Sequence, residues 1–374
     1  MTHITTPTAE PTTARDLRLD VLRAGALAVV VIWHWVFTSL DWSSSGPHTD
    51  NPVTTHPWLW TLTWFAQPMC VFFAVGGALH ARDRRRPGEF YAARLRRLLP
   101  PVLPLVTVAL AVILAADATG NAAISRAVTL AVSPMWFLGV YLVLIALAPA
   151  GRWAHARAGV LVQVVLLATV ALVDTWRLST GADHLVVQIG MLCLTWAFVH
   201  QLGFHLTTLF TNRRAAACLA TTGLLALCAL SLTPRYPAAM VGSSASHMSN
   251  MGPPNLMVAA LAMFQLGLIS LAAAPLARIA ERVRDHLAVV NQHSMRIFTW
   301  HMVAFVAFAV LAHRLGLDND LGSQHWWETR PLWLAGPLAV YLTAAALTRA
   351  AARRPITRAR RPTRTRPARR TRRT

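Results

Sequence analysis

The chain contains ten long runs of apolar residues, and this pattern constrains its fold more than any other feature. Most runs are close to the ~20 residues that a helix needs to cross the ~30 Å hydrocarbon core of a bilayer. Apolar residues make up 55% of the 374 positions and charged residues only 13%, which excludes an ordinary soluble domain. We therefore predict an all-α fold, a polytopic transmembrane bundle of about ten helices within residues 19–350. The runs fall at approximately 21–40, 58–80, 98–116, 128–150, 158–176, 184–206, 215–233, 255–275, 287–312 and 332–350.

Two polar segments flank this membrane domain. Residues 1–18 are rich in Thr and Pro and lack the small-residue cleavage site of a signal peptide, so the first apolar run is expected to remain as a helix. Residues 351–374 consist mainly of Arg, Pro, Thr and Ala and cannot form a core. We expect both segments to be disordered tails, the second lying against anionic lipid headgroups.

The positive charge of the chain follows its predicted topology. The sequence holds 35 Lys plus Arg, all of them Arg, against 15 Asp plus Glu, for a formal net charge of +20. The arginines concentrate in alternate connections, most densely between Arg82 and Arg97. Cytoplasmic loops carry such an excess, so we predict a multi-pass protein of the cell membrane with both termini in the cytoplasm. This distribution explains the charge without a nucleic-acid partner. The outward connections would be 41–57, 117–127, 177–183, 234–254 and 313–331.

The four cysteines show no spacing that binds a metal. Cys70, Cys193, Cys218 and Cys228 all lie within apolar runs and none belongs to a Cys-x-x-Cys pair, so we predict packing residues and no metal site. The acidic residues fall in loops, tails or helix ends. A proton-coupled transporter usually needs a carboxylate within the membrane, so this distribution disfavours that class.

Arg23 and His34 are the polar residues of most functional interest in the first run. At 100° per residue, a step of eleven residues returns to within roughly 20° of its starting direction, about 16 Å further along the helix. Both side chains should therefore share one face. A charged side chain in the hydrocarbon layer costs at least ~2.5–3.5 kcal/mol, so such residues usually line a functional polar cavity. Histidine, with an ordinary pKa of about 6.5, can accept a proton from a hydroxyl group. The alternative is a neutral structural histidine bonded to a neighbouring helix.

Three further residues are candidates for binding. Arg94 and Arg97 lie three residues apart before the third apolar run, where guanidinium groups could bind phosphate oxygens in pairs. The alternative is that they only set the membrane topology. His301 lies in the ninth run in a setting similar to that of His34 and could share its cavity, or could be a structural histidine. His200 and His205, five residues apart, are poorly placed to bind a metal together.

Five segments of the chain also carry a family resemblance, which depends on their common order and spacing. They are Leu19–Arg23 with His34, Phe72–Leu79, Phe90–Pro100, Trp136–Leu138 with Tyr141, and Ser294–His301. Together they resemble the motifs of the membrane-bound acyltransferase family 3. In the second segment, Gly76 stands where the family has a serine and Ala78 where it has a phenylalanine. The role of that serine is therefore not transferred to this chain.

The resemblance implies an integral membrane O-acyltransferase. Such an enzyme moves an acyl group, here expected to be acetyl, from cytosolic acyl-coenzyme A to a hydroxyl of a carbohydrate, a cell-envelope component or a secondary metabolite. Acyl-coenzyme A is then a co-substrate, and no further cofactor is implied. Under this hypothesis Arg94 and Arg97 bind the phosphates of the coenzyme, whose pantetheine arm passes Arg23.

The same hypothesis assigns the catalytic roles. His34, with Arg23 on the same face, would deprotonate the acceptor hydroxyl, while His301, Trp136 and Tyr141 would contact substrate. A backbone carbonyl or Asp41 would orient the imidazole ring of His34.

Two other classes remain open at this point. A permease or exporter of a lipid-linked or acylated sugar would have broken helices at corresponding positions of two halves, and acyl-coenzyme A would not stabilise it. A lipid-organising scaffold would leave Arg23 and His34 unexplained. The sequence leaves the acyl group, the acceptor, the face on which the acceptor binds and the oligomeric state open.

Overall fold

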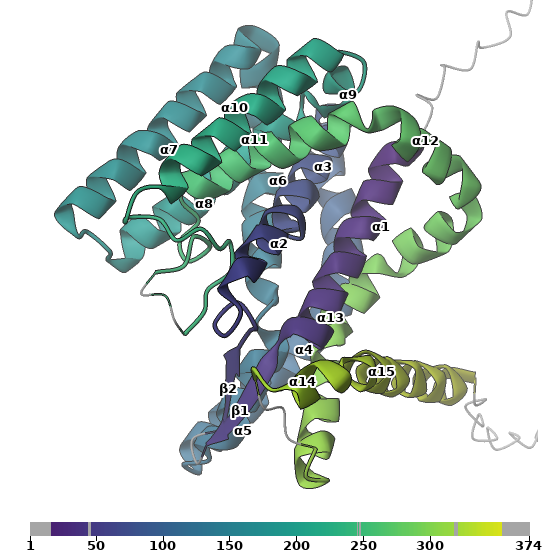
Figure 1. Ribbon diagram of the computed structural model, residues 1–374. Coiled ribbons are helices and arrows are strands. Elements are labelled where there is room, and N and C mark those ends of the chain that lie inside the picture. Colours follow the sequence, from purple (N-terminus) through teal and green to yellow (C-terminus); the bar gives the residue numbers. More distant parts are fainter. Residues whose placement is uncertain (1–15, 44–45, 245, 247, 318–320, 354–374) are drawn as a thin grey trace, which may run out of the picture.

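The computed structural model describes residues 16–43, 46–244, 246, 248–317 and 321–353, and most of them form helices (Figure 1). The predicted tails lie largely outside the described residues, which leave out 1–15 and 354–374. The first helix begins at Leu17, with the Asp16 side chain accepting from the Arg18 backbone N–H as its N-cap. Helix therefore starts two residues before the predicted boundary of the membrane domain.

Each of the ten predicted runs corresponds to helix, so the predicted fold class is confirmed. Within the described chain, nine helical segments are long and apolar enough to cross a membrane, and a bent pair of helices makes a tenth. The nine are α1 with η1 (Leu17–Phe37), η2 with α2 and α3 (Pro57–Ala81), α4 (Pro87–Ala118), α6 (Met135–Ala158), α7 (Val160–Thr180), α8 (Leu185–Gly203), α10 (Arg213–Ser231), α13 (Arg284–Arg314) and α15 (Arg330–Arg353).

The eighth predicted run is not one straight helix. It divides into α11 (Leu256–Leu271) and α12 (Ala273–Arg282), which meet at an angle of 68°. Pro275 lies in the first turn of α12, where it has no N–H to continue the hydrogen bonding of α11. The break therefore has a local cause.

Short elements complete the described chain. The first spanning segment ends in a π-helical turn, η1 (Trp33–Phe37), and then enters an antiparallel hairpin. The remaining elements are β1 (Ser39–Ser43), β2 (Gly46–Asp50), η2 (Pro57–Leu59), α2 (Trp60–Phe65), α3 (Met69–Ala81), α5 (Ala122–Val132), α9 (Leu206–Leu209) and α14 (Gln324–Glu328).

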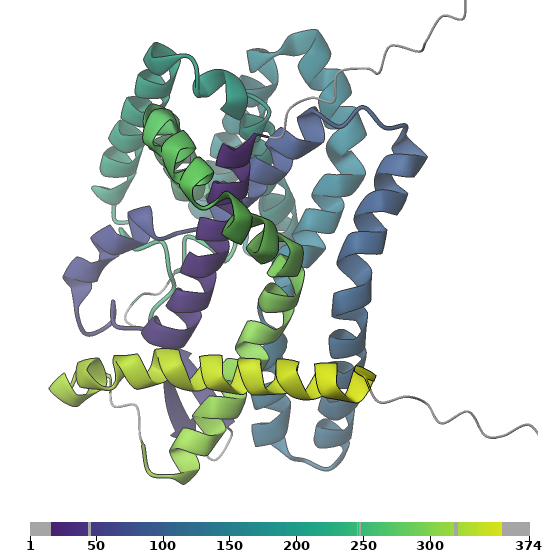
Figure 2. The same cartoon turned by 90° about the vertical axis from the view of Figure 1, so that its right-hand side faces the viewer.

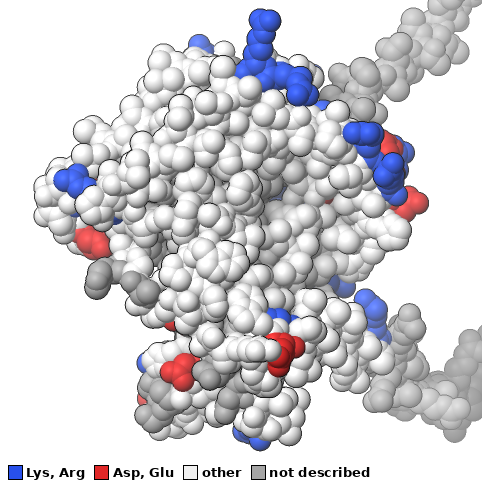
Figure 3. Space-filling view, in the orientation of Figure 1, with Lys and Arg blue, Asp and Glu red and all other residues white. Residues whose placement is uncertain are grey.

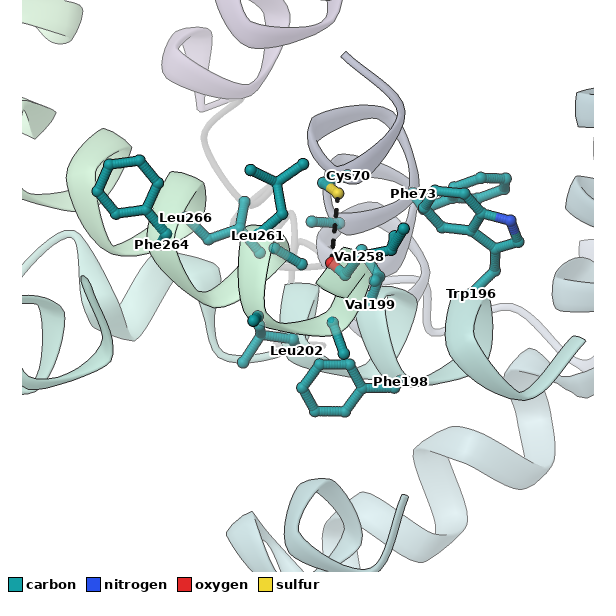
Figure 4. Packing of buried hydrophobic residues seen from close by; sticks show 14 of the residues in the cluster. Cys70, Phe73, Trp196, Phe198, Val199, Leu202, Val258, Leu261, Phe264 and Leu266 are labelled. Atoms are coloured by element: carbon teal, nitrogen blue, oxygen red, sulfur yellow. Dashed lines mark hydrogen bonds between the residues drawn. The ribbon is translucent and has the colours of Figure 1, made fainter. Parts of the chain in front are cut away.

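The largest core cluster lies where α3, α8 and α11 meet. Phe73 of α3 packs against Trp196 of α8, with ring centroids 4.4 Å apart, and the Cys70 thiol donates to the Val258 carbonyl of α11 at 3.9 Å (Figure 4). Cys70 is fully buried, as predicted for a packing residue. The same prediction is wrong for Cys218 and Cys228, which lie exposed on α10.

Glycine residues allow α3 and α8 to approach closely. A Cβ atom on Gly77 would overlap the His200 carbonyl oxygen, and one on Gly203 would overlap the Ala74 backbone. Helices within a bilayer gain little from hydrophobic burial against one another, so close backbone contact at small residues supplies much of their packing.

We expect Gly203→Leu to destabilise the bundle by roughly 1–3 kcal/mol or more, because the new side chain must force α8 away from α3. Thermal unfolding in detergent measures this as a lower midpoint. Gly190→Leu is the matched control on the same helix, since a Cβ at Gly190 would meet no atom within 4 Å. Equal midpoints for the two variants would contradict close α3–α8 packing.

The last described helix departs from a simple parallel bundle. In both views α15 lies across α1 and α13 rather than beside them (Figures 1 and 2). Its Trp333 packs against Phe305 and Phe308 of α13, with ring centroids 5.9 and 5.3 Å away. At its start, the buried Arg330 guanidinium donates to the Val36 carbonyl of η1 at 3.2 Å. The tenth run is a helix, as predicted, but its direction follows from these contacts.

Charged side chains gather toward the two ends of the molecule, and the broad flank between them is almost uncharged on the face shown in Figure 3. We call one end the arginine-rich end. It holds the starts of α1, α4, α10 and α13, with Arg18, the connection 82–86 and Arg284. The other end carries the β1–β2 hairpin, α5 and α14 and is called the hairpin end.

Candidate active site

A cavity of about 470 Å³ opens at the arginine-rich end between α1, α3, α4 and α13. Arg23, Arg94 and Arg97, which the sequence singled out, all line it, together with Arg82. We call this the arginine cavity. A second cavity of about 800 Å³ adjoins it and shares Asp20 and Arg82 as lining residues. Four guanidinium groups around one cavity of this size suit a phosphate-bearing ligand.

Asn291 of α13 joins two of these arginines. Its side-chain Oδ1 accepts from Arg23 Nε at 2.8 Å, and its backbone carbonyl accepts from an Arg97 NH2 group at 3.3 Å. The amide of Asn291 in turn donates to the Asp20 carbonyl at 3.3 Å, and the residue is only 2% exposed. Sequence reasoning missed Asn291, although a polar residue inside the ninth apolar run was the available signal.

Arg94 is held by an acidic partner in the α3–α4 connection. Its guanidinium donates to Asp83 Oδ2 at 3.0 Å, and Arg85 pairs with the same carboxylate at 2.7 Å. Burial alone would raise the pKa of Asp83. Hydrogen bonds from Arg85 and the charges of Arg85 and Arg94 outweigh it and hold that pKa at about 2. Arg94 Nε has no hydrogen-bond partner among the described residues, so this buried donor is available to a ligand.

His34 and His301 face each other across α1 and α13. The Nδ1 atom of His34 lies 2.9 Å from the Val30 carbonyl oxygen and 3.3 Å from Nε2 of His301. Nδ1 of His301 lies 2.7 Å from the Phe298 carbonyl oxygen. A carbonyl oxygen only accepts, so each ring carries a proton on Nδ1. Nε2 of His301 therefore accepts from His34, and Nε2 of His34 keeps its lone pair.

The structure changes the predicted position of His34. The first predicted run continued past His34 to residue 40, whereas His34 lies half-buried in η1, the last turn of that span. A π-helical turn is wide and is often found at functional sites. Trp35, in the same turn, donates from its indole to the His301 carbonyl at 2.9 Å and ties η1 to α13. Of the two predicted orienting groups, the backbone carbonyl is present, while Asp41 lies exposed on β1.

A row of aromatic rings connects His301 with Tyr141 of α6. Phe298 lies 6.0 Å from His301 and 5.4 Å from Phe137, and Phe137 stacks on Tyr141 at 5.9 Å between ring centroids. Tyr141 and His301 thus belong to one continuous row of packed rings. Trp136, the third residue assigned to substrate binding, is 42% exposed, and its ring centroid lies 6.4 Å from that of Phe137 and 6.3 Å from that of Trp196.

A second histidine pair lies behind Tyr141. The Tyr141 hydroxyl is 3.3 Å from His80 Nε2, and His80 Nδ1 is 2.9 Å from His200 Nε2. The sequence assigned no role to His200 and did not single out His80. The Tyr141 ring also packs closely on Gly76, where a Cβ atom would come within 2.8 Å of it.

The described residues contain no group of three His, Cys, Asp or Glu side chains that could hold a metal ion. The site places the lone pair on Nε2 of His34 at one end of the first spanning segment and the arginine cavity at the other. Eleven residues of helix separate His34 from Arg23, about 16 Å along the axis.

Comparison with known proteins supports an enzyme family. A family model described as an acyltransferase domain matches residues 16–349, which is most of the chain. No curated protein and no solved structure matches.

Proposed function

This chain belongs to the membrane-bound acyltransferase family 3 and is a multi-pass membrane acyltransferase, and we propose that it takes its acyl group from acyl-coenzyme A. The observation that carries the proposal is the arginine cavity, in which Arg23, Arg94 and Arg97 converge. The phosphates of the coenzyme bind there, and the pantetheine arm extends past Arg23 toward His34. The transferred group is acetyl, and the acceptor is a hydroxyl of a carbohydrate, a cell-envelope component or a secondary metabolite.

The histidine pair supports a general-base mechanism. Nε2 of His34 takes the proton of the acceptor hydroxyl as its oxygen attacks the thioester carbonyl. The tetrahedral intermediate collapses by breaking the carbon–sulfur bond, so the ester forms and the coenzyme leaves as a thiolate, which takes the proton from His34. While His34 is charged, the lone pair on His301 Nε2 accepts from its Nδ1–H and stabilises the imidazolium.

The charge distribution supports an orientation in the cell membrane. The arginine-rich end faces the cytoplasm, where acyl-coenzyme A is made, and both termini lie on that side. The hairpin end and His34 then lie toward the outer face. An exporter would need broken helices at corresponding positions of two halves, whereas the described chain has one bent pair, α11 with α12.

Replacing Arg94 and Arg97 together with alanine tests donor binding. Each hydrogen bond to a charged group contributes roughly 1.5–3 kcal/mol, so we expect the KM for acetyl-coenzyme A to rise at least about tenfold. Radiolabelled acetyl-coenzyme A supplied to the purified protein with candidate acceptors measures this. Thermal stabilisation by the coenzyme should weaken in parallel.

Arg96→Ala is the matched control for this experiment. Arg96 lies between the two tested arginines in the sequence, but it does not line the arginine cavity, and its Nε donates to the Ala92 carbonyl of its own helix. The donor proposal fails if the double variant binds the coenzyme as tightly as Arg96→Ala does.

A further inference from the structure

An apolar groove of about 500 Å³ lies on a different flank of the molecule from the arginine cavity. Helices α7, α8, α10 and α11 enclose it, and none of them lines the arginine cavity. Its walls are almost entirely apolar, with Leu167, Phe198, Leu219 and Met263 among them. These residues belong to membrane-spanning helices, so the groove is surrounded by lipid, and lipid can enter it.

The length of the groove matches one leaflet of a bilayer. Along α10 it runs from Asn212, at the arginine-rich end, to Thr222 near the middle of the helix. Ten residues of helix span about 15 Å, which is half of the ~30 Å hydrocarbon core. A lipid chain that enters beside Asn212 would therefore end near the midplane.

Most of the polar side chains that line the groove lie at its arginine-rich end. Gln163 is 7% exposed and its Oε1 atom has no hydrogen-bond partner among the described residues, while its Nε2 donates to the Gln201 carbonyl at 2.7 Å. His205 also lines this end, and its Nε2 has no partner in the described part of the chain. Burial and the neighbouring His155 lower the pKa of His205, so its ring is neutral and its Nε2 can donate or accept a hydrogen bond. Gln163 Oε1 needs a donor, and a hydroxyl group can satisfy both side chains.

Two exposed arginines stand beside the same end. Arg213 and Arg214 form the first turn of α10, next to Asn212, which lines the groove and caps the helix. Arginines are prominent at this upper margin of the molecule, where α9 and α10 meet (Figure 3). Two guanidinium groups at the N-terminus of a 19-residue helix favour an anion.

We propose that this groove is a binding site for one anionic glycerophospholipid with a hydroxyl-bearing headgroup, phosphatidylglycerol. One acyl chain lies between α7 and α10, the phosphate lies beside Arg213 and Arg214, and the glycerol hydroxyls donate to Gln163 Oε1 and form a hydrogen bond with Nε2 of His205. Lipid tails are as apolar as the groove itself, so burial of the chain alone gives no preference among lipids. The headgroup contacts decide which lipid binds.

The cysteines of α10 provide the test. Cys218 lines the groove, whereas Cys228 is exposed on the same helix ten residues further on and outside it. Two proteins are made from the full chain, one with Cys193→Ser and Cys228→Ser, the other with Cys193→Ser and Cys218→Ser. Alkylation of each protein by a fluorescent maleimide is followed in detergent, with phosphatidylglycerol or phosphatidylcholine added.

We expect phosphatidylglycerol to slow alkylation of Cys218 at least about fivefold and to leave Cys228 unchanged. Phosphatidylcholine should protect Cys218 much less, and Arg213→Ser with Arg214→Ser should remove the difference between the two lipids. Native mass spectrometry should find one retained phosphatidylglycerol, which Leu219→Trp abolishes by filling the groove. Leu225→Trp, on the exposed face of α10, should retain it.

The outcomes separate this site from the donor site. Unchanged alkylation of Cys218 in both lipids would overturn the groove as a lipid site, and equal protection by both lipids would overturn the headgroup assignment. The arginine variants of α10 should bind acetyl-coenzyme A as the unaltered protein does, because neither residue lines the arginine cavity. Loss of coenzyme binding in these variants would contradict a separate lipid site.

Discussion

His34→Ala is expected to slow acyl transfer by about 10²–10⁴-fold, the usual contribution of a general base, while the protein remains folded in the membrane. The imidazole contributes one hydrogen bond to its own helix and one contact to His301, so its loss removes the base without opening a helix interface. Product formation from labelled acetyl-coenzyme A measures the rate. The unfolding midpoint in detergent shows whether the fold is kept.

His293→Ala is the matched control. Nδ1 of His293 lies 2.9 Å from the Val289 carbonyl oxygen, the same contact with its own helix that His34 makes with Val30. His293 is not part of the histidine pair, so its replacement should leave turnover unchanged. Full acyl transfer by His34→Ala would remove the proposed mechanism, whatever the control shows.

The largest loss of stability is expected from Asp174→Ala. Asp174 of α7 is fully buried and accepts from Arg177 at 3.0 Å, from the Tyr236 hydroxyl at 2.8 Å and from the backbone N–H of Leu256 at 3.0 Å. It thereby joins α7, the connection before α11 and the first turn of α11. Removing one partner of a buried ion pair typically costs about 3–5 kcal/mol, because the remaining charge, here Arg177, stays buried.

Asp183→Ala distinguishes this effect from a general loss of charge. Asp183 pairs with the same arginine at 3.3 Å, but its side chain is 56% exposed, so its loss should cost about 0–1 kcal/mol. Chemical or thermal unfolding of both variants in detergent gives the comparison. Similar destabilisation by the two substitutions would show that Asp174 is not a structural junction.

Local patterns account for most of what the sequence predicted correctly. The ten apolar runs marked the helices because a spanning helix needs a long, continuous apolar segment, which is visible without knowing its neighbours. The shared face of Arg23 and His34 followed from helix geometry alone, and the structure has both side chains contacting α13. The sequence also placed acidic residues only in loops, tails or helix ends. Asp174 agrees with that placement, since it lies in the last two turns of α7, but the sequence did not show that it is completely buried.

What the sequence could not show depends on contacts between distant residues. Asn291 bonds Arg23 across 268 positions of the chain, and His80 meets His200 across 120. The crosswise direction of α15 depends on its packing against α13, while its composition resembles that of any spanning helix. The contact of the Trp136 ring with Trp196 of α8 is of the same kind, since it joins residues 60 positions apart.

The bond between Arg330 and the Val36 carbonyl has a consequence for biosynthesis. The turn that holds His34 is made well before its partner, because Arg330 is translated nearly three hundred codons later than Val36. Until α14 and α15 have been made, the Val36 carbonyl lacks the hydrogen bond from Arg330 that holds the turn in place. The nascent chain therefore acquires the complete geometry around His34 only after Arg330 has been translated.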